Sequence, residues 1–560
     1  MRKTVVIVAL VFIPVSFAHA QIDTSERDAL IAFYNATNGS GWTDNTNWIG
    51  AVGTECTWYG VTCSGGHVTE LWLQFNQLAG AIPSEIGDLA SAKTLSLGGN
   101  QLSGSIPPEL ENLSSVLYLY LHANDLSGTI PPELGNLSTL RKLQLNFNDL
   151  SGSIPPELGD LTNLWTLKLG SNQLTGSIPP ELGKLSSLKE MFLDRNPLSG
   201  GIPPEFEDLS SLTKLDLDRT ELTEPIPPEF GNLSSLEVLH LFDSQLTGPI
   251  PPELENLSSL TYLALGGNQL SGPIPPELGN MSQLEHLFLE SNQLDGSIPS
   301  TLSNLTNLIT LRLSSNRLTG QIPSELEYLT GLSNDGGLRI RWNALHTEDA
   351  SLIAFLEAKQ LDGDWQSTQT VAPVNLTFSQ EGDHTIWLSW DAVSYQADRG
   401  GYSVFSAPTG SGVWTAGGWT EEKTDTSYPV TGLDPGETYD FAVVSYTDPH
   451  TNNQNLVNSD FSAEVTNTTA NTGCVQPEIQ IGWERPITLS LSGSFDSYLW
   501  STGETTSTID INPLFDQWYW VTVTSTGPCE ETASIWVDPT TIFANGFESG
   551  DTTWWSNTVP

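Results

Sequence analysis

Side chains that commonly carry catalysis or bind metals are few in this 560-residue chain, which has eight histidines and four cysteines. The sequence contains no H-E-x-x-H, no G-x-S-x-G, no phosphate-binding glycine loop and no C-x-x-C pair, so the common hydrolase, nucleotide-binding and metal-site motifs are missing. His122, His240 and His286 lie in different segments among non-ligand neighbours, whereas a metal site needs three or four convergent ligands. We therefore expect no catalytic residue, no metal site and no cofactor, and we predict that the protein is not an enzyme.

The charge balance narrows the possible partners. The chain has 66 acidic and 20 basic residues, for a formal net charge of −46. Such a surface repels phosphate backbones and anionic lipid, so we expect no nucleic-acid partner. The cysteines form two local pairs, Cys56 with Cys63 and Cys474 with Cys529, which suits disulfides in an oxidising compartment.

The N-terminus points to export. Arg2 and Lys3 precede an apolar run over residues 5–17, and Ala18-His19-Ala20 has the small-x-small form of a cleavage site. We predict a signal peptide over residues 1–20, cleaved after Ala20. The apolar run is short for a membrane span, and no later stretch is apolar enough to form one. We therefore expect a secreted or cell-surface protein without a transmembrane segment, and a monomer.

One repeated unit organises the middle of the chain. Ile-Pro pairs recur at a constant interval, from Ile82 and Ile106 through to Ile322, within a unit that reads L-x-L-x-x-N-x-L-[ST]-G-x-I-P-x-E-L-x-x-L-[ST]-x-L. A strict period of this length is typical of a solenoid, in which each coil buries its apolar face against its neighbours. Alternation in the L-x-L segment predicts one short strand per coil, with the leucines inward. The Pro-Pro-Glu run predicts a short helical turn on the opposite side, because proline suits the first helical position.

This unit resembles the plant-type leucine-rich repeat. The resemblance implies an α/β solenoid of 24-residue repeats over residues 71–346, with a parallel β-sheet on the concave face. Residues 21–70, with a helix over 24–37 and Trp58 between Cys56 and Cys63, resemble the N-terminal cap of that class. Residues 347–370 are expected to hold a C-terminal capping helix, over 348–360, and a linker.

An asparagine follows most of the predicted strands. We expect its side chain to satisfy backbone groups where each coil turns inward, as a structural ladder. The ladder comprises Asn76, Asn100, Asn124, Asn148, Asn172, Asn196, Asn268, Asn292, Asn316 and Asn343. Thr220 and Ser244 replace the asparagine in two coils, which either drift or a functional change would explain.

Beyond the repeats the pattern changes to alternating β-strands, and we predict two all-β sandwich domains. Residues 371–470, with Trp390 and the segment that ends in Tyr439, resemble a fibronectin type III domain, in which that tyrosine hydroxyl ties back to upstream backbone. Residues 474–538 resemble an immunoglobulin-like bacterial surface module. Residues 541–560 are similar to tails of exported Gram-negative proteins, which suggests a bacterial source and a sorting role.

The concave face is the candidate binding surface, because strand alternation turns one set of side chains outward there. Outward aromatic side chains are costly to expose and often mark binding sites. The predicted ligand contacts are Trp72, Tyr118, Tyr120, His122, Lys142, Lys168, Phe192, Asp194, Asp216, His240, Phe242, Tyr262, His286 and Phe288. The alternative is that the rings reflect strand propensity and pack only on each other.

These observations favour an exported, non-enzymatic recognition or adhesion protein that binds a protein or glycan on the concave face. Other functions remain open. One is inhibition of polysaccharide-degrading enzymes, since secreted inhibitors of pectin-degrading enzymes share this repeat and cap. Others are binding of ice or another surface, and a purely structural stalk.

Overall fold

The computed structural model describes most of the chain, in two compact units. The described residues are 22–334, 336–360, 365–381, 384–470, 478–482, 487–492, 495, 497–511, 517–524 and 530–537. The repeat unit comprises residues 1–316, 322–340 and 348–363, and the C-terminal unit comprises residues 317–321, 341–347 and 364–560. The predicted signal peptide and tail, and both Cys474 and Cys529, lie outside the described residues.

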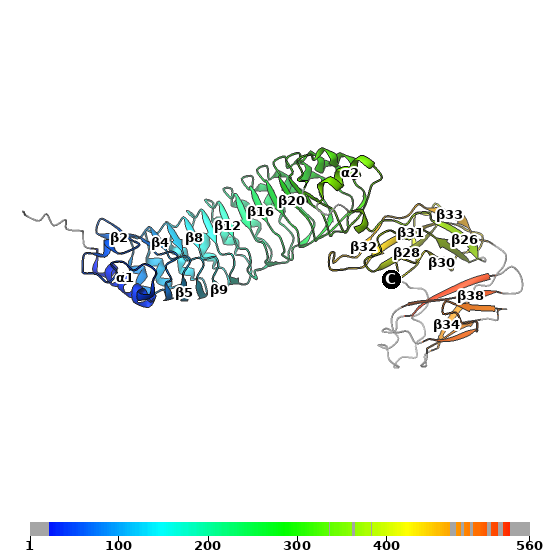
Figure 1. Cartoon of the computed structure of the whole chain (residues 1–560), viewed down its shortest axis with the longest axis horizontal. Coiled ribbons are helices and arrows are strands. Elements are labelled where there is room, and N and C mark those ends of the chain that lie inside the picture. The colour runs from blue at the N-terminus through cyan, green and yellow to red at the C-terminus, as the bar shows by residue number, and fades with distance from the viewer. Residues whose placement is uncertain are drawn as a thin grey trace, which may run out of the picture. The chain divides into compact units, whose positions relative to one another are not determined.

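The repeat unit is the predicted solenoid, built on one 13-stranded sheet (Figure 1). Its first two strands are antiparallel and all later pairs are parallel. Each parallel pair joins equivalent residues of neighbouring coils, including Leu311 with Leu338 at the longer last coil. In sheet order the strands are β1 (Val61–Ser64), β2 (His67–Trp72), β4 (Thr94–Ser96), β6 (Tyr118–Tyr120), β8 (Lys142–Gln144), β10 (Thr166–Lys168), β12 (Glu190–Phe192), β14 (Lys214–Asp216), β16 (Val238–His240), β18 (Tyr262–Ala264), β20 (His286–Phe288), β22 (Thr310–Arg312) and β24 (Leu338–Arg339).

Apolar side chains of the repeat fill the interior of each coil. In one coil Leu134, Leu143 and Leu145 are fully buried, and Ile154 is 1% exposed. Burial of a leucine side chain contributes about 1.5–3 kcal/mol, so a stack of such coils has a continuous apolar core.

The predicted helical turns are present in successive coils as short 3₁₀ helices. In the Pro-Pro-Glu coils the first proline is the N-cap residue and the second begins the turn, as at Pro107 and Pro108. The turns are η3 (Ser84–Asp88), η4 (Pro108–Asn112), η5 (Pro132–Asn136), η6 (Pro156–Asp160), η7 (Pro180–Lys184), η8 (Pro204–Asp208), η9 (Pro228–Asn232), η10 (Pro252–Asn256), η11 (Pro276–Asn280), η12 (Ser300–Asn304) and η13 (Ser324–Tyr328).

Short strands just after the ladder asparagine pair in parallel from coil to coil. One five-stranded sheet contains β3 (Ala79–Ala81), β5 (Gln101–Gly104), β7 (Asp125–Gly128), β9 (Asp149–Gly152) and β11 (Gln173–Leu174). Smaller sheets contain β13 (Ser199–Gly200) with β15 (Glu221–Leu222), β17 (Thr247–Gly248) with β19 (Gln269–Pro273) and β21 (Gln293–Asp295), and β23 (Thr319–Gln321) with β25 (Ala344–His346).

The ladder asparagines cross-link neighbouring coils, and Asn148 shows the pattern. Its Nδ2 donates to the carbonyl oxygens of Leu121 (3.1 Å) and Leu145 (2.9 Å), and its Oδ1 accepts the backbone N–H of Leu126 (3.1 Å). Asn76 differs, because its side chain instead bonds the backbone of Asp44 in the N-terminal cap.

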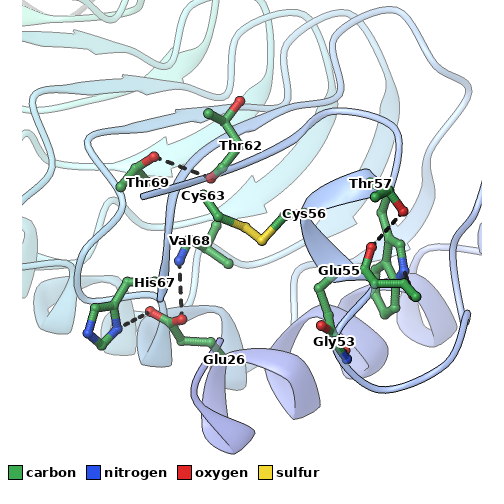
Figure 2. The surroundings of a disulfide bond; sticks show 12 residues. Glu26, Gly53, Glu55, Cys56, Thr57, Thr62, Cys63, His67, Val68 and Thr69 are labelled. Atoms are coloured by element: carbon green, nitrogen blue, oxygen red, sulfur yellow. Dashed lines mark hydrogen bonds and ion pairs between the residues drawn. A yellow bond between two sulfur atoms is a disulfide. The ribbon is translucent and has the colours of Figure 1, made fainter. Parts of the chain in front are cut away.

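Both ends of the solenoid are capped. Helix α1 (Thr24–Ala36) buries Ala29, Leu30 and Phe33, and the adjoining loop has the short turns η1 (Gly39–Gly41) and η2 (Glu55–Thr57). Figure 2 shows the Cys56–Cys63 disulfide beside this helix. The other end is covered by α2 (Ala350–Lys359), which buries Leu352 and Leu356.

The C-terminal unit contains antiparallel sheets, as predicted. After η14 (Gln366–Thr368), one sheet holds β26 (Thr377–Glu381), β27 (Thr385–Ser389) and β30 (Ser427–Val430). A second holds β28 (Gly400–Pro408), β29 (Thr415–Trp419), β31 (Thr438–Thr447), β32 (Val457–Asn458) and β33 (Val465–Thr468). Trp390 lies in the core of this region, and the hydroxyl of Tyr439 accepts the backbone N–H of Asp434 at 3.1 Å, which is the predicted tie.

Two further three-stranded antiparallel sheets follow. One contains β34 (Glu478–Gly482), β35 (Ile487–Ser492) and β37 (Thr508–Ile511), and the other contains β36 (Ser497–Trp500), β38 (Gln517–Thr524) and β39 (Glu530–Val537). An immunoglobulin-like relationship for this region stays a prediction.

Candidate site on the concave face

Each coil has three positions on the concave face: the residue before the first inward leucine, the residue between the two leucines, and the residue after the second. The predicted contacts occupy these positions, and none of their side chains lies in the packed interior. Trp72 is 45% exposed, and the other predicted contacts are half-buried. Parallel pairing places equivalent residues of neighbouring coils side by side, as for Asp216 and His240.

A first aromatic cluster lies on β6. The rings of Tyr118 and Tyr120 are nearly parallel, at 5°, with centroids 6.2 Å apart, and the ring of His122 meets Tyr120 edge-on at 6.3 Å. Burial raises the pKa of Tyr120 and lowers that of His122. Phe192 lies three strands away along the sheet, where Lys168 Nζ is 4.6 Å from its ring centroid.

A second, larger aromatic cluster spans β16, β18 and β20. The Tyr262 ring contacts His240 at 4.7 Å, His286 at 5.2 Å and Phe288 at 5.1 Å between centroids. The guanidinium of Arg312 lies 4.9 Å from the Phe288 ring centroid. The structure therefore places Phe288 in this cluster, separate from the one on β6.

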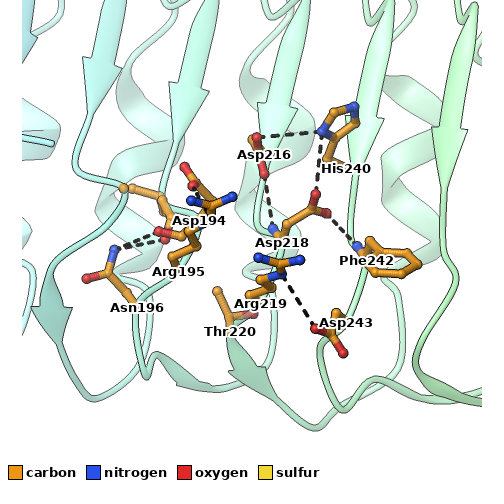
Figure 3. A network of polar contacts seen from close by, with 12 residues as sticks. Asp194, Arg195, Asn196, Asp216, Asp218, Arg219, Thr220, His240, Phe242 and Asp243 are labelled. Carbon is orange, nitrogen blue, oxygen red and sulfur yellow. Dashed lines mark hydrogen bonds and ion pairs between the residues drawn. The ribbon is translucent and has the colours of Figure 1, made fainter. Parts of the chain in front are cut away.

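A polar group adjoins the second cluster, on β14 and β16 (Figure 3). His240 Nδ1 lies 3.6 Å from Asp216 Oδ2 and 3.6 Å from Asp218 Oδ2. Asp216 Oδ1 accepts the backbone N–H of Asp218 (3.1 Å), and Asp218 Oδ1 accepts the backbone N–H of Phe242 (2.6 Å). Both carboxylates are thus held by backbone with their second oxygens toward the imidazole.

The electrostatics of this group follow from partial burial and crowded like charges. Burial and the neighbouring charge of Asp216 raise the pKa of Asp218 to about 6, and the same two causes raise the pKa of Asp194. Burial alone would lower the pKa of His240, but Asp216 and Asp218 raise it overall. Carboxylates that are half removed from water favour an additional positive charge.

We expected that no potential metal-binding side chains would lie close together, and the structure contradicts this expectation. One ligand atom from each of Asp216, Asp218 and His240 lies within 4.8 Å of the others. Sequence reasoning missed this group, and it left Asp218, Glu290 and Arg312 out of the predicted contacts. The signal was present: Asp216 and Asp218 are two residues apart at outward positions of one coil, and His240 occupies the position of Asp216 in the next repeat.

No helix in the described part of the chain is long and apolar enough to cross a membrane.

Comparison with known proteins agrees with this architecture. Ten segments between residues 91 and 329 match the Leucine Rich Repeat family model, and residues 371–455 match the Fibronectin type III domain model. Among solved structures, the ectodomain of the Arabidopsis thaliana receptor kinase GASSHO1/SCHENGEN3, in complex with CASPARIAN STRIP INTEGRITY FACTOR 2, is 38% identical over 51% of this chain and 37% of that chain, with a TM-score of 0.46. This chain thus spans well under two thirds of that receptor ectodomain.

Two shorter proteins are also similar. A plant ice-binding protein is 29% identical over 54% of this chain and 90% of its own, with a TM-score of 0.43. A leucine-rich-repeat protein of Leptospira interrogans is 33% identical over 51% of this chain and 76% of its own, with a TM-score of 0.39. All three TM-scores lie below 0.5, so these likenesses transfer no ligand to this chain. The family matches show that it contains an array of leucine-rich repeats followed by a fibronectin type III domain.

Proposed function

We propose that this protein is an exported, non-enzymatic recognition protein that binds a protein or glycan on the concave face of its repeats. The C-terminal β domains serve as spacers or additional adhesion units, and the predicted signal peptide directs export.

The observation that carries this proposal is the continuous patch from β14 to β22. The half-buried carboxylates of Asp216 and Asp218 lie beside His240, whose ring contacts Tyr262. Tyr262 in turn contacts Phe288, and Arg312 follows on the next strand. Rings that combine apolar faces with nearby polar groups are the composition typical of interface centres. Strand propensity alone explains the rings but not the charged side chains interleaved with them.

The first cluster supports the same proposal in another way. Tyr118 and Tyr120 present two nearly parallel rings on one strand, and both rings are only half-buried. A ligand that covers them gains apolar burial without any rearrangement of the sheet, at about 25 cal/mol per Å².

The test is capture by the immobilised full chain, from protein extracts and on a glycan array. We expect that replacing Tyr120, Tyr262 and Phe288 with alanine abolishes capture while the melting temperature of the repeat unit changes little. The matched control replaces Phe75 and Phe147, which are 73% and 54% exposed and lie outside the three outward positions of each coil. Retained capture by the triple variant, or equal loss in the control, would overturn the proposal.

A further inference from the structure

We infer that Asp216, Asp218 and His240 form a binding site for a zinc-class divalent cation on the concave face. This site is independent of the partner proposed above. Asp216 ends β14, Asp218 lies in the turn that follows it, and His240 ends β16, where it is the register partner of Asp216.

The distances fit a bridging ion better than a direct ion pair. His240 Nδ1 is 3.6 Å from an oxygen of each of two carboxylates, which is longer than an N–H···O hydrogen bond. Two ligands held at about 2.1 Å from a tetrahedral Zn²⁺ lie about 3.4 Å apart. The imidazole nitrogen is equidistant from two carboxylate oxygens at nearly this separation, and the three ligand atoms all lie within 4.8 Å of one another, which leaves a central position for a small cation.

The carboxylates are already oriented for this role. One oxygen of each accepts a backbone N–H, from Asp218 for Asp216 and from Phe242 for Asp218, and the other oxygen faces His240. Hydrogen bonds that hold the non-coordinating atoms of ligands are the usual support of a metal site. Binding of the ion would therefore require little additional ordering of the Asp216 and Asp218 side chains.

Charge at the group also favours a cation. Within the described part of the chain, neither Asp216 nor Asp218 forms an ion pair with lysine or arginine. Two arginines of these coils pair with other carboxylates: Arg195 lies 4.0 Å from Asp194, and Arg219 lies 3.5 Å from Asp243. A third carboxylate, that of Asp194, adds to the negative field around Asp216 and Asp218.

The break in the asparagine ladder coincides with this group. Thr220 and Ser244 replace the ladder asparagine in the same two coils that supply Asp216, Asp218 and His240. Their hydroxyls are 3.0 Å apart, and both reach the carbonyl of Leu217. The altered ladder positions and the three ligands therefore lie in the same two coils.

The ligand types select the ion. One imidazole nitrogen with two carboxylate oxygens suits Zn²⁺, whereas Ca²⁺ takes six to eight oxygen ligands and Mg²⁺ a nearly ideal octahedron. Three protein ligands leave a coordination position for water or for a group of a bound partner.

The test is titration of the tag-free full chain with Zn²⁺ alone, by calorimetry in chelator-treated buffer, and with Co²⁺ followed by its visible absorption. We expect one saturable site, a four-coordinate Co²⁺ spectrum, and a zinc-dependent rise in melting temperature, because the ion binds the folded state. Asp218→Asn and His240→Gln should each weaken zinc binding at least tenfold.

The controls are Asp243→Asn, which removes a carboxylate paired outside the group, and His286→Gln, which removes an imidazole of the same face two strands away. Both should bind zinc within twofold of the unchanged chain. Circular dichroism without zinc checks folding, and Asp216→Asn supplies a third ligand variant should another unfold. Absence of saturable zinc binding, or equal affinity in the ligand variants, would overturn the inference. Since no partner is present, this outcome is separate from that of the capture experiment.

Discussion

The interior ladder and the concave face of the same coils obey opposite rules. Asn148 belongs to a set that recurs from coil to coil and bonds backbone atoms of two coils. Asn146, two residues earlier, faces outward at a position where other coils have His122 or Asp194. The repeat conserves the interior residues that each coil needs to fold, whereas the outward residues of the concave face vary from coil to coil. Function is therefore to be sought where the repeat is not kept.

The largest expected effect breaks the ladder itself. Asn148→Ala leaves the backbone N–H of Leu126 without a partner. It also removes one of the two amide donors from each of the Leu121 and Leu145 carbonyls, so we expect the free energy of unfolding of the repeat unit to fall by about 2–3 kcal/mol. Asn146→Ala should cost about 0.5 kcal/mol or less, as for an outward side chain. Thermal melts of both variants measure the difference, and equal losses would contradict the contrast between interior and concave face.

A smaller effect should follow from repairing the ladder. The double substitution Thr220→Asn and Ser244→Asn restores the donors and acceptors that the two hydroxyls lack. We expect the double variant to gain about 1–2 kcal/mol of stability, from two or more recovered hydrogen bonds. Unchanged zinc affinity would show that the two departures are separable. Destabilisation would mean that these coils have a different backbone requirement.

The C-terminal unit contains a buried lysine, Lys423, whose effect on stability should depend on pH. Lys423 is 4% exposed, and burial lowers its pKa to about 8. Between pH 8 and 10.5 the unfolded chain therefore binds more protons at this amine than the folded chain does, so this residue's destabilising effect disappears as pH rises. Relative to Lys423→Met, the unchanged protein should gain a few degrees in melting temperature between pH 7 and pH 10. Parallel pH profiles of the two proteins would contradict this.

The smallest expected effect concerns the turn just before the ladder asparagine. Ala123 has φ of 53°, a left-handed conformation that favours glycine, and Gly99 occupies the equivalent position one coil earlier. Ala123→Gly removes backbone strain but increases the entropy of the unfolded chain, for a net gain of about 0.5 kcal/mol. Chemical denaturation of the pair would detect it, and a loss of stability would show that Ala123 makes contacts worth more than the strain.

Sequence reasoning predicted the solenoid well, because the repeat supplies internal copies of the same physical problem. The inward leucines, the proline-initiated turns and the ladder all follow from residues that recur. The site was harder to predict. The outward positions could be named from alternation, but the contact of Phe288 with Tyr262 was not predicted, and the convergence of Asp218 with Asp216 and His240 was missed. Such contacts depend on side-chain rotamers and on which outward residues lie next to each other in neighbouring coils. The repeat period alone does not determine either.

The most direct test of function on the concave face is oxidative footprinting of the full chain with and without the first ligand it captures. We expect protection of Tyr120, Tyr262 and Phe288 and unchanged oxidation of the exposed Phe75 and Phe147. Protection confined to residues outside the concave face, with those three rings equally oxidised in both states, would contradict the proposal that this face is the binding surface.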